Sequence, residues 1–189
     1  MRNIQQSAEK LQISNLSMED IPNIDLYMDQ VIQLFEKKLE GTKRNEQDKI
    51  LTKTMINNYS KAKLLFPIKN KKYSKQHLIL ISLIYQLKGT LSMNDIKATL
   101  DGINNNIEET DFPLEGFYDV YLKLTEINKE AFRSDIIERS KEVSKESEQI
   151  ETEESSYIEQ VLLIASLVNV SNLYRRLAEK LVDELEEEE

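Results

Sequence analysis

Residues 75–88 are the stretch that most constrains how this chain can fold. On a helix, their apolar side chains point to nearly every side, at Leu78, Ile79, Leu80, Ile81, Leu83, Ile84 and Leu87. A helix that is apolar all round must be buried, so other elements have to surround it. Ser74 is suited to cap its start and Gly89 to end it. We therefore expect a buried central helix that organises the elements on either side.

Residues 52–62 predict an amphipathic helix with two different faces. One face is apolar, with Met55, Ile56, Tyr59 and Ala62, and the other is polar, with Lys53, Thr54, Asn57 and Lys61, and Asn58 at its flank. Asparagine amides can bridge the major-groove edge of adenine, and ammonium groups contact phosphates or guanine. The polar face therefore has the chemistry of a DNA reader, although a solvated surface helix would carry the same residue types.

Residues 66–73 lie between these two helices and predict a short basic wing. Pro67 prevents a helix and Asn70 favours a turn. Three lysines at its tip, Lys69, Lys71 and Lys72, are candidates for phosphate contacts, and Tyr73 stands at its base. His77 is the only histidine and follows Ser74 by three positions, so we expect it to cap the central helix or to contact a phosphate.

The rest of the chain predicts an all-α fold. Four glycines and three prolines in 189 residues disfavour a turn-rich β protein. Periodicity predicts further helices at residues 22–40, 92–100, about 114–138 and 155–185, with loops at 41–49 and 101–113 and either a helix extension or a linker at 139–154. We divide the chain into an N-terminal arm (residues 1–20), a DNA-binding head (21–102) and a helical dimerisation or effector region (103–189).

Charge separates the two ends of the chain. Residues 37–75 carry 12 basic and 3 acidic side chains, a balance of +9, whereas residues 101–189 carry 9 basic and 24 acidic ones, a balance of −15. Exposed charges are screened beyond about 8–10 Å at moderate salt, so a basic end can bind a polyanion despite the overall net charge of −9. The asymmetry favours a binding end and an assembly end.

Several classes of protein are disfavoured. The absence of cysteine excludes a disulfide framework, a thiolate metal site and a cysteine nucleophile, and fits a cytoplasmic protein. The first residues lack the apolar run of a signal peptide, and the longest charge-free stretch, residues 160–174, is shorter than a bilayer span. Without a phosphate-binding loop, nucleophile elbow or cofactor fingerprint, we expect no enzymatic activity, no cofactor and no bound metal.

The order of these elements resembles the winged helix-turn-helix of MerR-type regulators. The resemblance lies in residues 55–65, with an aromatic, a basic residue and paired leucines; in residues 71–78, where a tyrosine precedes the capping serine; and in residues 87–97. More closely, residues 26–30, 51–59 and 71–74 resemble a bacterial family catalogued as a domain of unknown function and related to MerR regulators. Two positions depart from the MerR pattern, which commonly has arginine at Asn57 and glycine at Lys63.

The resemblance implies a DNA-binding transcriptional regulator. It places residues 52–62 in the major groove and the wing on flanking phosphates, with Tyr59 as a core anchor or a contact to the DNA backbone. The long C-terminal helices would form a homodimer whose two heads read half-sites about one helical turn apart. The alternative is a non-enzymatic protein-interaction module that uses the apolar surface of the last helix to hold a partner.

Overall fold

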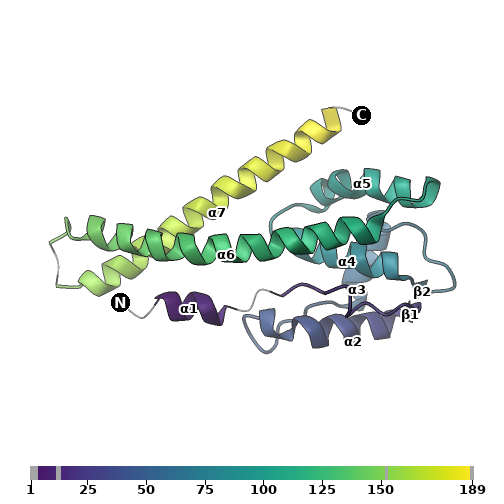
Figure 1. Cartoon of the computed structure of the whole chain (residues 1–189), viewed down its shortest axis with the longest axis horizontal. Coiled ribbons are helices and arrows are strands. Elements are labelled where there is room, and N and C mark those ends of the chain that lie inside the picture. The colour runs from purple at the N-terminus through teal and green to yellow at the C-terminus, as the bar shows by residue number, and fades with distance from the viewer. Residues whose placement is uncertain (1–3, 12–13, 152, 188–189) are drawn as a thin grey trace. The chain divides into compact units, whose positions relative to one another are not determined.

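The structure is a computed structural model that describes residues 4–11, 14–151 and 153–187, except for the side chains of Gln5 and Glu108 (Figure 1). Its elements follow one another along the chain as α1 (Ile4–Lys10), β1 (Leu26–Tyr27), α2 (Met28–Leu39), a short 3-10 helix η1 (Glu40–Thr42), α3 (Lys53–Lys61), β2 (Lys72–Tyr73), α4 (Lys75–Leu87), α5 (Met93–Glu109), α6 (Leu114–Ser147) and α7 (Ser155–Glu187). The chain is thus mostly helical, as the sequence predicted, with one small two-stranded sheet.

The chain divides into two compact units. The larger one, which we call the head unit, comprises Ile13–Lys123 and Glu179–Glu189. The smaller one, the helical unit, comprises Met1–Gln12 and Leu124–Ala178. The long helices α6 and α7 each contribute residues to both units.

Helix α4 forms the centre of the head unit's core. Every side chain from His77 to Ile84 is buried, which confirms the expectation of a central buried helix. The amphipathic helices around it turn their apolar faces inward, at Val31, Phe35 and Leu39 of α2, Ile56 and Tyr59 of α3, and Ile96 and Leu100 of α5. Burial of these side chains provides the main driving force for folding of the head.

The segment before α2 differs from the prediction of one helix over residues 22–40. Residues 26 and 27 form β1, which pairs antiparallel with β2 in the register Leu26 with Tyr73 and Tyr27 with Lys72. Helix α2 therefore begins only at Met28. The backbone N–H of Tyr27 donates to Gln30 Oε1 over 2.8 Å, which satisfies one of the donors at the helix start. The wing strand is held by this earlier segment.

Helix α5 continues through a region predicted to be a loop. It extends from Met93 to Glu109, so the expected loop at residues 101–113 is wrong in its first part. Asparagine has a low helix propensity, but the Asn104 side chain donates hydrogen bonds to the carbonyls of Leu64 (3.2 Å) and Leu100 (3.1 Å). Ile103 and Ile107 pack against the core. These tertiary contacts outweigh the local preference.

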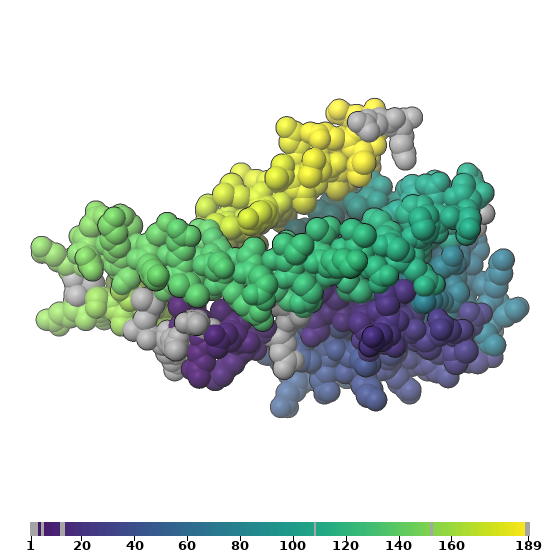
Figure 2. Space-filling model, in the orientation of Figure 1, coloured from purple at the N-terminus to yellow at the C-terminus, as the bar shows by residue number. Residues whose placement is uncertain are grey.

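Residues 14–20, which precede the sheet, also belong to the core of the head. Leu16 is completely buried, and its carbonyl accepts a 2.6 Å hydrogen bond from the Tyr118 hydroxyl of α6. Gln86 of α4 donates to the carbonyl of Ser14 over 3.3 Å. In Figure 2 the dark purple surface of this segment borders the first part of α6. The polar sequence of residues 1–20 did not predict this packing.

In the helical unit, α6 remains helical through its charged second half to Ser147, so residues 139–147 of the stretch expected to be a helix extension or a linker are a helix extension. The described residues between Ser147 and the start of α7 at Ser155 are not helical. Pairs such as Asp135 and Arg139, whose carboxylate and guanidinium are 2.7 Å apart, lie one turn apart along it. Ser144 donates to Glu159 of α7 over 2.8 Å, and Leu163 and Ile136 are buried. No helix in the described part of the chain is both long and apolar enough to cross a membrane.

Candidate nucleic-acid interface

Helix α3 is fixed at its start by its own cap. Thr52 is the N-cap, as predicted, and its hydroxyl accepts the backbone N–H of Met55 over 3.1 Å. The preceding residues, Ile50 and Leu51, are buried in the core. The helix therefore begins at a defined position.

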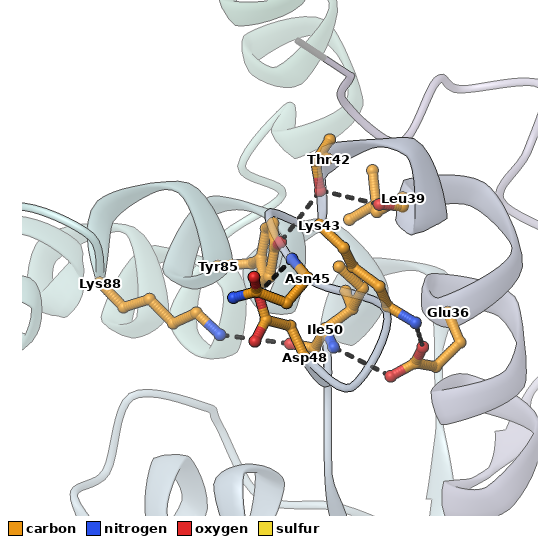
Figure 3. Close-up of polar contacts among 9 residues, drawn as sticks. All are labelled: Glu36, Leu39, Thr42, Lys43, Asn45, Asp48, Ile50, Tyr85 and Lys88. Carbon is orange, nitrogen blue, oxygen red and sulfur yellow. Dashed lines mark hydrogen bonds and ion pairs between the residues drawn. The ribbon is translucent and has the colours of Figure 1, made fainter. Parts of the chain in front are cut away.

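Two charged side chains hold the loop that leads into α3 (Figure 3). Glu36 of α2 accepts the backbone N–H of Ile50 over 2.9 Å, and Lys88, beyond α4, donates to the carbonyl of the same residue over 3.2 Å. Glu36 also pairs with Lys43 at 2.6 Å. The backbone N–H and carbonyl of Ile50 are thus both bonded to charged side chains immediately before α3.

The environment of this loop shifts the titration of its charged groups. Burial alone would raise the pKa of Glu36, but the hydrogen bonds from Lys43 and Ile50 bring it below its usual value. Burial lowers the pKa of Lys88, whose ammonium lies 4.3 Å from the centroid of the Tyr85 ring. Tyr85 in turn is 3.3 Å from the hydroxyl of Thr42 (Figure 3).

The end of α3 is equally well defined. The N–H of Leu64 bonds to the carbonyl of Tyr59 over 2.9 Å and that of Lys63 to Ser60 over 3.1 Å, the pattern of a Schellman motif. Lys63 occupies its left-handed position with φ 58°. The turn thus adopts a conformation that favours glycine, although the sequence has a lysine there.

The outward face of α3 is arranged as the sequence predicted. Ile56 and Tyr59 are buried on the inner face, and Tyr59 is a core anchor. The candidate side chains on the outer face are all exposed, namely Lys53, Thr54, Asn57, Asn58 and Lys61. Their amides and ammonium groups are free to meet a ligand surface, apart from Lys53, which is 2.8 Å from Asp29.

The wing is a tight turn joined to a two-residue strand. Asn70 (φ 52°) and Lys71 (φ 58°) are its central residues, and the N–H of Lys72 bonds to the carbonyl of Lys69 over 3.0 Å. Positive φ at both central positions is the pattern of a type I′ turn. Lys69 and Lys71 are exposed at its tip, and within the described residues neither forms an ion pair within 4.0 Å.

The start of α2 contacts both the first residue of α3 and the wing. Asp29 pairs with Lys53 across the surface, and the Tyr27 ring lies 5.2 Å from the ammonium of Lys72. Lys53 and Lys72 therefore share one edge of the head. Sequence reasoning missed Tyr27 and Asp29, because their role depends on the pairing of β1 with β2.

Two candidates are not on the surface. Tyr73 is only 3% exposed, so its side chain belongs to the core and we remove it from the set of DNA contacts. His77 is also 3% exposed, which excludes the phosphate contact considered for it. Its Nδ1 accepts the N–H of Ser74 over 3.1 Å, as expected for a capping residue, and its Nε2 is 3.2 Å from the carbonyl of Phe66. Burial lowers the pKa of His77, against the opposing effects of Phe66 and Asp25.

The described residues contain no group of three or more histidine, aspartate or glutamate side chains arranged to hold a metal ion. The exposed polar groups of α3 and the wing include amides and ammonium groups. Such groups suit phosphate and base-edge contacts.

Comparison with known proteins identifies the family of this chain. No curated protein and no solved structure matches it. A family model described as "Domain of unknown function (DUF1836)" matches residues 16–121, which is more than half of the chain and nearly the same span as the continuous part of the head unit. The chain therefore belongs to the DUF1836 family.

Proposed function

We propose that this protein is a sequence-specific, non-enzymatic DNA-binding transcriptional regulator in the bacterial cytoplasm, with a head of the MerR winged helix-turn-helix type. Helix α3 enters the major groove, and the wing lysines contact flanking phosphates. The observation that carries the proposal is the exposed face of α3, which presents two asparagines between two lysines on a helix fixed at both ends. Asparagine amides on a helix whose ends are fixed can bridge an adenine edge.

Each candidate residue has a distinct role in this proposal. Asn57 and Asn58 contact base edges, and Thr54 lies beside them on the same exposed face. The lysines contact phosphates, which fixes the register without reading sequence. Four of them, Lys61, Lys69, Lys71 and Lys72, belong to no ion pair within 4.0 Å in the described residues, so phosphate contacts need not displace a carboxylate.

A homodimer is part of the proposal. In the helical unit, Tyr157, Val161, Ile164 and Val168 of α7 are 42–63% exposed and follow one another at spacings of 4, 3 and 4 residues. This is the spacing of a coiled-coil seam, which a second copy of the helix can cover. A dimer would present two heads to half-sites about 34 Å apart along the duplex.

The same stripe supports the rival function. If a different protein covers α7, the chain is an interaction module and the head is a scaffold. The acidic C-terminal half, with a balance of −15, would repel DNA and suits a basic partner. Size measurement separates the two, because a stable symmetric dimer supports the regulator and a monomer with an exposed apolar stripe supports the module.

Two substitutions test how the head would read DNA. We expect Asn57→Ala to lower affinity by about 1–3 kcal/mol on the preferred sequence and to leave random duplex nearly unchanged. We expect Lys71→Ala to weaken binding on both and to reduce the salt slope by about one unit. Fluorescence anisotropy at several salt concentrations measures both effects. Equal losses on preferred and random DNA for both variants would overturn the role of Asn57.

A further inference from the structure

An exposed ion pair joins the first residue of α3 to the first turn of α2. The ammonium of Lys53 lies 2.8 Å from Oδ1 of Asp29, and the two side chains are 65% and 67% exposed. Exposed ion pairs stabilise a fold only slightly. Both groups can therefore bind a ligand at little cost to the stability of the head.

The backbone holds both residues at fixed helix starts. Thr52 caps α3 immediately before Lys53, and Tyr27, two residues before Asp29, is paired with the wing strand β2. On α3, Asn57 lies one turn after Lys53 on the same exposed face. The ion pair therefore adjoins the amide that contacts a base in the proposed function.

Lys53 differs from other lysines of the proposed interface, because a carboxylate lies beside its ammonium. Lys61, Lys69 and Lys71 form no ion pair within 4.0 Å in the part of the chain that the structure describes. A phosphate bound to Lys53 would come close to the negative charge of Asp29, which repels it. A base edge carries no net charge and offers donors as well as acceptors, so it suits this pair of groups better.

The major-groove edge of a G·C pair complements the two charged groups. Guanine presents the acceptors N7 and O6, and cytosine presents the donor N4 next to O6. A Watson–Crick hydrogen bond joins N4 to O6, so these atoms are about 2.9 Å apart, close to the 2.8 Å between Lys53 and Asp29. An ammonium bonded to Asp29 has two hydrogens left for O6 and N7, and Asp29 Oδ2 can accept the outward hydrogen of N4.

From this match we infer that Lys53 and Asp29 together recognise a G·C base pair, with Lys53 donating to guanine and Asp29 accepting from cytosine. The inference rests on the proposed function, in which α3 enters the major groove. An A·T pair presents one donor between two acceptors in either orientation. The ammonium can pair with only one of these acceptors, and the carboxylate would face the other, which disfavours A·T.

The spacing along α3 places this base pair relative to the adenine contacted by Asn57. One helical turn rises about 5.4 Å, and successive base pairs are about 3.4 Å apart. The G·C pair should therefore lie about one or two base pairs from that adenine.

Selection of bound sequences from a pool of random duplexes tests the inference. We expect the full-length wild type to select sites with the G·C pair beside the adenine. Asp29→Ala and Lys53→Ala should each still select the adenine but lose the preference for G·C. Asp119→Ala removes an exposed carboxylate from α6 in the head unit and should keep the wild-type preference.

Fluorescence anisotropy on the selected duplex gives the size of the effect. Replacing its G·C pair by A·T should weaken binding of the wild type about tenfold and binding of Asp29→Ala by less than about twofold. Asp29→Ala can also bind all DNA more tightly, because it removes a negative charge. The comparison of two duplexes within each variant separates recognition of the base pair from this general effect.

Three results would overturn the inference while leaving the proposed function in place. These are wild-type sites without a G·C pair at that position, an unchanged preference for G·C in Asp29→Ala, or an equal gain of affinity for both duplexes as the only effect of Asp29→Ala. If the wild type selected no sequence at all, the inference and the proposed function would both be wrong.

Discussion

Two buried tyrosines of the head differ in whether their hydroxyls have partners. The hydroxyl of Tyr118 donates to Leu16 and lies 2.7 Å from Ser82, whereas that of Tyr59 has no partner among the described residues. Burial raises the pKa of both side chains to about 12, so both are neutral at physiological pH. Their contributions to stability should nevertheless be unequal, because an unpartnered buried hydroxyl opposes folding.

Phenylalanine substitutions at these two sites measure that difference. We expect Tyr118→Phe to lower the free energy of unfolding by about 1–2 kcal/mol, because it leaves the Leu16 carbonyl without its donor. Tyr59→Phe should leave it unchanged or raise it by a few tenths of a kcal/mol. Urea unfolding followed by circular dichroism is the measurement, and equal destabilisation by both changes would contradict the assigned contacts.

His77 makes stability depend on pH where its imidazole titrates in the unfolded chain. Its pKa is lowered in the folded state, chiefly by burial, and returns to about 6.5 on unfolding. As pH falls below 6.5, the unfolded chain takes up a proton before the folded one, so the free energy of unfolding decreases. Because His77 is the only histidine, no other imidazole contributes to this window.

Replacing the imidazole should remove this dependence. Glutamine can still accept the N–H of Ser74 as in a capping box, so we expect His77→Gln to fold with a flat melting temperature from pH 7 to 5. The lowered pKa values of Asp20, Glu36 and Asp135 affect stability only at lower pH, where these carboxylates are protonated. If the melting temperature of the variant changed with pH as much as that of the wild type, His77 would be excluded as the source of the pH dependence.

At the scale of elements, α3 ends in a turn whose left-handed residue, Lys63, can be tested by substitution. Lys63 is held at φ 58°, where a Cβ is unfavourable, so Lys63→Gly should stabilise the head by about 0.5–1 kcal/mol. Lys61→Gly, two residues earlier at the last helical position, should destabilise it instead. Thermal unfolding of both variants shows whether each substitution raises or lowers the stability. Loss of stability in Lys63→Gly would contradict a left-handed residue at this turn.

The loop before α3 depends on Glu36. Removal of its carboxylate would leave the N–H of Ile50 and the ammonium of Lys43 without their shared partner, so Glu36→Ala should lower the free energy of unfolding by about 1–3 kcal/mol. Glu46→Ala, an exposed change in the same loop, should alter it by less than about 0.5 kcal/mol. If both variants lowered the free energy of unfolding by similar amounts in urea, the contact between Glu36 and Ile50 would not be what positions the loop.

Helices with local signals were predictable, and contacts between distant segments were not. Thr52 and Ser74 mark the starts of α3 and α4. Each N-cap residue interacts with the residue three positions later, so both helix starts can be predicted from the local sequence. The pairing of Leu26 with Tyr73 spans two-residue strands, which carry no alternation pattern. Asn104 favours a loop locally and is held in α5 by the Leu64 carbonyl, which sequence periodicity cannot reveal.

The candidate interface followed the same rule. The exposed residues of α3 were predicted from helical periodicity, because its inner face is fixed by Ile56 and Tyr59. Burial of Tyr73 and the contacts of Lys53 and Lys72 with the start of α2 depend on the sheet, so they were not predicted.

At the scale of the whole molecule, assembly should depend on the stripe along α7. A charge at Ile164 would be buried without a partner in a dimer, so Ile164→Glu should convert a dimer of twice 22.1 kDa into a monomer. Asn169→Asp adds the same charge to an exposed site that points away from the stripe and should leave the dimer intact. Light scattering after size exclusion measures the mass. A monomeric wild type would contradict the proposed dimer.

The proposed DNA-binding function is tested most directly by titrating the wild-type chain against labelled duplexes and following fluorescence anisotropy. One duplex is taken from immediately upstream of the protein's own gene and the other has a random sequence, each at several salt concentrations. We predict a preference of about 10³ for the upstream duplex and a steep decrease of affinity with salt. No binding to either duplex at low salt would contradict the proposal and would favour a protein partner on α7.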